Sequence, residues 1–265
     1  MQTATSFATE PSTDISIDAR TDISTEFDAA AILDALASHG YYRSPTPAPF
    51  AAFERLMASI ASVKRPMELR TGGRNPVLES ERGMTPHNDC NHYADCVAWY
   101  CRRADGAGDR TFITEIADVV AELDGDDLEA MAGVGIHLPL HEVARTRVVR
   151  RVGGRARVFW SFSAVQVPRS PERARLIELV QAFRSRVNEV GARARIQGGP
   201  IALDDGQFLI IDDHRFFHGR DPLPPGSRRH LFRCYLRLHD PRLRAAKLAF
   251  QPDHANQADR ADRAE

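Results

Sequence analysis

The stretch GQFLIIDDHRFFHGRDPLPPGSRRHLFRCYLR, residues 206–237, contains three predicted strands of one sheet. Its first apolar run, residues 208–211, has the length of a buried strand and ends at two aspartates. A second short strand carries His218. The third carries Arg229 and Arg233 on one face, because side chains an even number of residues apart share a face of a strand. An imidazole and two guanidinium groups on neighbouring strands indicate a metal beside an anionic ligand.

The composition excludes several classes of partner. The 265 residues contain 35 Lys+Arg and 36 Asp+Glu, a net charge of −1, so we expect neither nucleic acid nor an anionic membrane as partner. The four cysteines form no CxxC pair, which is typical of reduced thiols, and neither a secretory signal pattern nor a membrane-spanning apolar run is found. We therefore expect a cytoplasmic protein, and the composition leaves its oligomeric state open.

The remaining chain predicts a single folded domain, residues 28–250. A partly disordered N-terminal tail, residues 1–27, and a polar C-terminal tail, residues 251–265, are expected on either side. Apolar periodicity predicts helices beginning near residues 28, 50, 116 and 170, and further strands at 41–43, 96–101, 136–140, 145–152, 155–162 and 201–203. Many short strands, few helices and no βαβ alternation favour a mainly β fold with flanking helices and a jelly-roll core.

Glycines mark the expected ends of several elements. Gly40 follows the helix that Asp28 caps, and Gly191 follows the long helix that Ser170-Pro171 opens. Gly153-Gly154 is a two-residue hairpin signal between two predicted strands.

A candidate metal site combines two distant parts of the chain. His87-Asn88-Asp89 supplies an imidazole and a carboxylate two residues apart, and thus on one face of an extended segment. Together with His218 these side chains form the two-histidine, one-carboxylate facial triad of non-haem Fe(II) oxygenases, which leaves three coordination positions open. An HxD tripeptide occurs often by chance in a chain with ten histidines. The arginines that follow His218 make the combination more specific.

With these motifs the chain resembles the taurine dioxygenase/clavaminate synthase-like family, from about Leu33 to Leu238. The likeness rests on Thr85–Asp89, Asp95–Cys101, Gly108–Thr111, Gly206–Arg220 and Arg228–Leu236. Members are Fe(II)- and 2-oxoglutarate-dependent oxygenases on a double-stranded β-helix. The resemblance implies that fold, with Fe(II) held by His87, Asp89 and His218.

The same resemblance implies contacts to the co-substrate. Thr111 matches the family threonine that contacts 2-oxoglutarate, and Thr114 is the alternative because the preceding glycines are spaced differently here. Arg229 matches the arginine that pairs with the distal carboxylate of 2-oxoglutarate. Arg233 matches a second inward arginine, which in relatives contacts the substrate or the metal-proximal carboxylate. Asp213 is a departure, since the family often has asparagine at this position.

We therefore expect an oxygenase that acts on a small molecule with O₂ as co-substrate. It would oxidise, normally hydroxylate, an unactivated C–H bond while 2-oxoglutarate is converted to succinate and CO₂. A jelly-roll protein that binds a metal or anion without turnover is one alternative. A metal-dependent hydrolase is the other.

Arg233 also bears on the class of substrate. It lies roughly 13 Å along the strand from Arg229, so one 2-oxoglutarate does not need both as anchors of its distal end. A buried guanidinium needs a negative partner, either an internal acid or a carboxylate of the substrate. The second option predicts an amino-acid-like or other carboxylate-bearing substrate, whose amino group Glu79 or Glu81 would receive. Pairing of Arg233 with an internal acid would contradict it.

Overall fold

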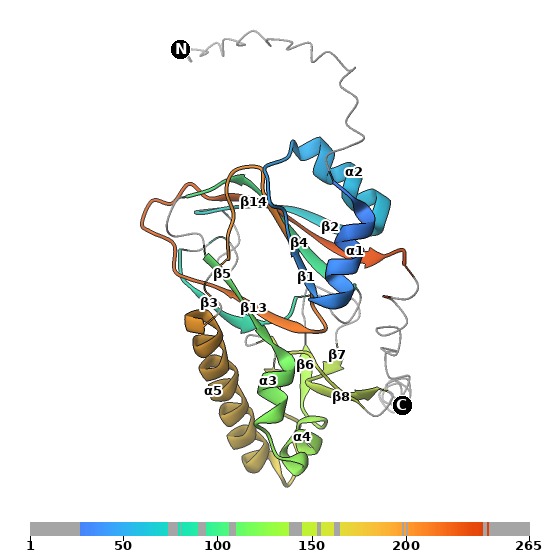
Figure 1. Ribbon diagram of the computed structural model, residues 1–265. Helices are drawn as coiled ribbons and strands as arrows, with labels where there is room; N and C mark the ends of the chain where they lie inside the picture. The colour runs from blue at the N-terminus through green and yellow to red at the C-terminus, as the bar shows by residue number, and fades with distance from the viewer. Residues whose placement is uncertain are drawn as a thin grey trace, which may run out of the picture.

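The computed structural model describes the central part of the chain, shown in Figure 1. The described residues are 27–73, 79, 81–89, 94–105, 110–137, 145–152, 155–161, 165–197, 199, 201–240 and 243. The two predicted tails lie outside this part, apart from Phe27, and so does the predicted Gly153-Gly154 turn.

Two antiparallel sheets form the centre of the molecule. The five-stranded sheet has the order β1 (Tyr41–Arg43), β12 (Phe208–Asp212), β4 (Cys96–Arg103), β14 (His230–Leu238) and β2 (Ala61–Arg70). The four-stranded sheet has the order β11 (Ile201–Ala202), β5 (Arg110–Glu115), β13 (Phe216–Arg220) and β3 (Met84–His87). The predicted strands of residues 206–237 are thus divided between the two sheets, because β13 leaves the sheet that contains β12 and β14.

The two sheets face each other across a layer of apolar side chains. This cluster includes Leu69, Val97, Trp99, Leu209, Ile211, Leu231 and Tyr235 from the five-stranded sheet, with Ile113 of β5 packed against it. The Trp99 ring lies 4.9 Å from the His218 ring of the opposite sheet, edge to face. Interior side chains of the two sheets therefore meet at the candidate metal ligand.

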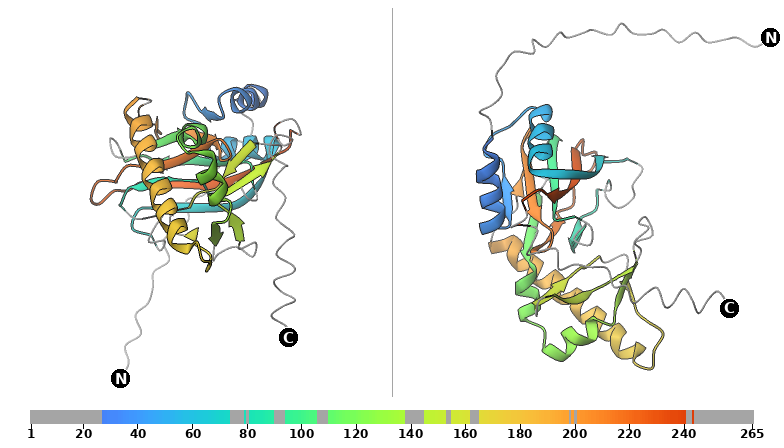
Figure 2. Two further views of the ribbon diagram at one scale, coloured as in Figure 1. Left: turned by 90° about the horizontal axis from the view of Figure 1, so that it is seen from below. Right: turned by 90° about the vertical axis from the view of Figure 1, so that its right-hand side faces the viewer.

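Helices cover the outer faces of both sheets. Helices α1 (Ala29–Ser38) and α2 (Phe50–Ile60) pack on the five-stranded sheet through a cluster that contains Phe53, Tyr100 and Phe208 (Figures 1 and 2). Helix α5 (Arg173–Gln197) runs along the four-stranded sheet, beside α3 (Ile116–Ala121) and α4 (Gly125–Met131). Two small sheets complete this lower part: β10 (Val165–Gln166), β6 (Gly135–His137) and β7 (Arg145–Arg147), and the hairpin of β8 (Val149–Val152) and β9 (Arg155–Val158). The prediction of a mainly β fold with flanking helices is confirmed.

The first predicted helix and its end are also confirmed. The side chain of Asp28 accepts a hydrogen bond from the Ala30 N–H at 2.8 Å, as an N-cap does. Gly40 follows α1 with φ +77°, the left-handed conformation that glycine adopts most readily.

The predicted role of Gly191 is wrong. Helix α5 continues past Gly191 to Gln197. A Cβ at Gly191 would lie 2.5 Å from the Cγ of Pro86, so this glycine allows α5 to approach β3 closely instead of ending the helix. The structure also contains α4, which was not predicted. None of the described helices combines the length and apolarity that a bilayer crossing requires.

Candidate metal centre

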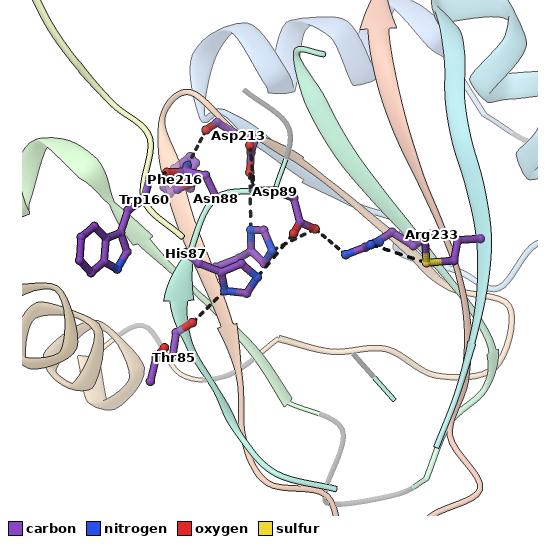
Figure 3. Close-up of polar contacts among 10 residues, drawn as sticks. Thr85, His87, Asn88, Asp89, Trp160, Asp213, Phe216 and Arg233 are labelled. Atoms are coloured by element: carbon purple, nitrogen blue, oxygen red, sulfur yellow. Dashed lines mark hydrogen bonds and ion pairs between the residues drawn. The ribbon is translucent and has the colours of Figure 1, made fainter. Parts of the chain in front are cut away.

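Neighbouring strands bring the two candidate histidines together. His87 ends β3 and pairs directly with His218 of β13 in the antiparallel ladder. Their ring centroids lie 4.4 Å apart, and both residues are buried. Asp89 follows β3 by two residues, and its carboxylate points back toward both rings (Figure 3). Among the described residues, His87, Asp89 and His218 form a group whose potential ligand atoms all lie within 4.8 Å of one another.

The atoms that converge are suited to a divalent metal. The Nε2 of His87 lies 3.5 Å from Asp89 Oδ1, and the Nε2 of His218 lies 3.5 Å from Asp89 Oδ2. Ligands at bond lengths of about 2.1 Å and right angles are separated by about 3 Å, so small side-chain shifts suffice. The Nδ1 of His87 lies 2.8 Å from the Thr85 carbonyl oxygen, which fixes a ring orientation with Nε2 toward the centre. The residues present fit Fe(II) as the facial triad requires.

The electrostatics of the site keep its carboxylate ionised. Arg233 donates a hydrogen bond to Asp89 Oδ2 at 2.7 Å. Burial opposes ionisation, but Arg233 and the two histidines hold the pKa of Asp89 well below its usual range. Burial, together with the positive charges of His87 and Arg233, lowers the pKa of His218 to about 4. His218 is thus neutral near pH 7. Burial opposes protonation of His87, but the hydrogen bond and negative charge of Asp89 raise the pKa of His87, so a metal competes with a proton for this imidazole.

Asn88, between the two ligands, fixes the end of β3 and was not identified from the sequence. Its side-chain amide donates to the carbonyl oxygens of Asp213 at 2.7 Å and Phe216 at 3.1 Å. Its Oδ1 accepts from the Trp160 N–H at 3.0 Å, and its backbone N–H donates to the Trp160 carbonyl at 2.8 Å (Figure 3). Four hydrogen bonds therefore anchor the segment that carries His87 and Asp89.

A pocket opens beside the two histidines, between the sheets. Its lining consists of Leu69, Met84, His87, Trp99, Thr111, His218, Gly219, Arg220, Arg229 and Arg233. Thr111 and Arg229, the expected contacts of 2-oxoglutarate, are both part of this lining. Thr114 is not, because it lies on the other face of β5, where its hydroxyl would be 3.6 Å from a Cβ at Gly191 of α5. Thr111 is therefore the better candidate.

Arg220 is a lining residue that sequence reasoning did not assign. It follows His218 by two residues on β13, and strand parity alone places it on the ligand face. Its guanidinium donates to the carbonyl oxygens of Arg82 at 2.8 Å and Asp221 at 3.2 Å. It thus joins β13 to the loop that leads into β3.

The expected substrate-binding role of Arg233 is corrected by its pairing with Asp89. Asp89 is an internal acid, and its pairing with Arg233 contradicts the prediction that Arg233 binds a carboxylate of the substrate. Asp89 supplies the negative partner that a buried guanidinium needs. Glu79 and Glu81 are not among the residues that line this pocket. Their carboxylates accept from the backbone N–H groups of Arg70 at 2.9 Å and Gly226 at 2.8 Å, so they tie loops together.

Comparisons with known proteins show the fold. No family model matches the sequence, and the search of curated proteins gives no match. An asparagine oxygenase solved with Fe(II), 3-hydroxyasparagine and succinate has a TM-score of 0.59 at 16% identity, covering 82% of this chain and 81% of that chain. PvcB from Pseudomonas aeruginosa has a TM-score of 0.57 at 18% identity, covering 80% of each chain. The non-heme iron oxygenase OrfP, solved with Fe and alpha-ketoglutaric acid, has a TM-score of 0.55 at 15% identity, covering 79% and 78%. The chain has the fold of these iron oxygenases, as the motif resemblance predicts.

Proposed function

We propose that the chain is a non-haem Fe(II)- and 2-oxoglutarate-dependent oxygenase built on a double-stranded β-helix, or jelly-roll, core. The observation that carries this proposal is the convergence of His87, Asp89 and His218 at one buried point beside a pocket with arginine side chains. Three protein ligands on one side leave the remaining positions of an octahedral metal for exogenous ligands. The fold shared with solved iron oxygenases supports it.

Asp89 and several of the lining residues have distinct roles in this proposal. His87, Asp89 and His218 hold Fe(II), which when bound supplies the activation of O₂. Arg229 binds the distal carboxylate of 2-oxoglutarate through a charge-assisted pair, and Thr111 contacts the same molecule. Trp99 and Leu69 exclude water from the co-substrate with their apolar surfaces. The protein thus positions the reactants, and the metal supplies the difficult chemistry.

The substrate in this proposal is a small, amino-acid-like metabolite that is hydroxylated at an unactivated C–H bond. Support comes from the neighbours, since the asparagine oxygenase is solved with 3-hydroxyasparagine and OrfP with (3S)-hydroxy-arginine. The reaction balances as substrate, O₂ and 2-oxoglutarate giving hydroxylated substrate, succinate and CO₂. Arg233 gives no support to a carboxylate-bearing substrate, because its guanidinium pairs with Asp89.

The test is substrate-triggered succinate formation. The protein is loaded with Fe(II) without oxygen, mixed with 2-oxoglutarate and a panel of free amino acids, and exposed to O₂. We expect at least one amino acid to raise succinate release and O₂ uptake together, and His87→Ala and His218→Ala to abolish both. Metal binding without any O₂-dependent succinate would favour the non-catalytic alternative. Product formation without O₂ and 2-oxoglutarate would favour a hydrolase.

A further inference from the structure

Asp213 is a fully buried carboxylate directly behind the metal ligands. It lies in the turn between β12 and β13, with 0% of its surface exposed. The backbone N–H of Asp89 lies 3.1 Å from both of its carboxylate oxygens. Its own carbonyl oxygen accepts from the Asn88 side chain at 2.7 Å. Asp213 therefore contacts the segment that carries one ligand and precedes the strand that carries another (Figure 3).

The carboxylate of Asp213 also faces His218 on the side away from the metal. Its Oδ1 lies 3.7 Å from the His218 Nδ1, and in the part of the chain that the structure describes Nδ1 has no hydrogen-bond acceptor. His87 shows the matching arrangement, with its Nδ1 at 2.8 Å from the Thr85 carbonyl. Both rings therefore turn Nε2 toward the centre and Nδ1 toward an oxygen.

We propose that Asp213 is a positioning residue for the metal centre, acting through His218. A histidine that binds a metal donates its other N–H to a carboxylate or carbonyl, which fixes the tautomer and makes the imidazole a stronger ligand. The separation of 3.7 Å is longer than a hydrogen bond, and a shift of the ring or the carboxylate by less than 1 Å would bring the two atoms within hydrogen-bond distance. The inference rests on the metal site of the proposed function.

A purely structural role for Asp213 predicts a different set of effects. In that case the carboxylate only holds the Asp89 backbone, and its charge is irrelevant to the metal. Asp213→Asn separates the two roles, because asparagine keeps the shape and an acceptor oxygen but removes the negative charge. Asp212→Asn is the matched control. Asp212 ends β12, next to Asp213 in the chain, but its carboxylate accepts from the His214 N–H at 2.9 Å.

The experiment measures Co(II) binding by calorimetry, the exchangeable proton signals of the Co(II) protein by NMR, and the unfolding temperature without metal. We expect Asp213→Asn to bind Co(II) about 10- to 100-fold more weakly than wild type. The Nδ1–H signal of one ligand histidine should shift while the other stays in place, and Asp212→Asn should behave as wild type. The metal-free unfolding temperature of Asp213→Asn should not fall, since a buried charge has been removed.

Unchanged Co(II) affinity in Asp213→Asn would overturn the proposal, whether or not its unfolding temperature falls. The wild-type protein with Zn(II) gives a measurement that needs no variant. Long-range ¹H–¹⁵N spectra should show His218 protonated at Nδ1, and the opposite tautomer would also overturn the proposal. Failure of the wild-type chain to bind either ion would instead overturn the metal site itself, and the role of Asp213 with it. Neither the Co(II) affinity nor the tautomer of His218 depends on oxygenase activity.

Discussion

At the scale of single residues, the pair of Arg233 and Asp89 determines the charge of the site before a metal binds. The side chains are 6% and 11% exposed, so the pair is largely shielded from water. The guanidinium stabilises the ionised carboxylate, and a divalent cation bound to Asp89 would stabilise the same charge. Arg233 and a bound metal would therefore both stabilise the ionised carboxylate of Asp89.

Removing this arginine should destabilise the metal-free protein and make its stability depend more strongly on a bound metal. Arg233→Leu leaves the carboxylate of Asp89 buried without its cation, and breaking a buried pair costs on the order of 3–5 kcal/mol. We expect the free energy of unfolding to fall by about this amount and to recover further on addition of Mn(II) than in wild type. Chemical denaturation with and without Mn(II) measures both. Arg193→Leu, which breaks an exposed pair with Glu122, should cost less than about 1 kcal/mol.

If Mn(II) raised the free energy of unfolding by the same amount in Arg233→Leu and in wild type, this explanation would be contradicted. The metal would then not replace the charge that the arginine supplies.

At the scale of elements, the close approach of α5 to β3 sets the position of the first ligand. Pro86 immediately precedes His87, and Gly191 leaves room for its ring. Gly191→Ala would place a methyl group where the Pro86 ring lies, and the rigid ring cannot rotate away. A clash at this contact would displace β3, which contains both Pro86 and the ligand His87.

Gly191→Ala should therefore destabilise the protein despite the higher helix propensity of alanine. Alanine would favour an unobstructed helix position by up to about 1 kcal/mol, whereas overpacking costs about 1–3 kcal/mol. We expect a lower unfolding temperature and weaker Mn(II) binding. Gly125→Ala is the control, because a Cβ at Gly125 of α4 meets nothing within 4 Å. A variant at Gly191 that is as stable as the control would show that α5 can shift without effect on β3.

The same elements show what the sequence can predict and what it cannot. α1, β1 and α2 were predictable because caps and apolar periodicity are local signals. β2 was missed because it is an edge strand, exposed along most of its length and interrupted by Pro66, so no alternating pattern marks it. Gly191 was misinterpreted because a glycine needed for close packing looks the same in sequence as one that ends a helix.

The candidate site shows a similar division between local and distant signals. His87, Asp89 and His218 were identified from residue type and parity, and the structure brings them together. The partner of Arg233 could not be predicted, because its contact with Asp89 is set by the tertiary structure. The contact of Asp213 with His218 likewise depends on how one turn packs against one strand, which no local pattern in the sequence encodes.

At the scale of the whole molecule, the pocket joins two sheets that are otherwise held together by apolar packing. The three candidate ligands come from β3, the residues after it, and β13, all on the side of the four-stranded sheet. Arg229 immediately precedes β14, in the five-stranded sheet. A metal alone would connect segments that are already hydrogen-bonded neighbours. A dicarboxylate that extends from the metal to Arg229 would connect the two sheets.

This arrangement predicts that the metal and 2-oxoglutarate stabilise the whole chain more than additively. A ligand at 100 times its dissociation constant stabilises by about 2.7 kcal/mol, but 2-oxoglutarate reaches such occupancy only when the metal holds its other end. We expect unfolding temperatures to rise with Mn(II), little with 2-oxoglutarate alone, and most with both. Arg229→Ala should keep the increase from Mn(II) and lose the additional increase from 2-oxoglutarate. Arg237→Ala, at an exposed arginine of β14, should keep both. If Arg229→Ala retained the additional increase, the distal carboxylate would have another partner, and the pocket would join the sheets through a different residue.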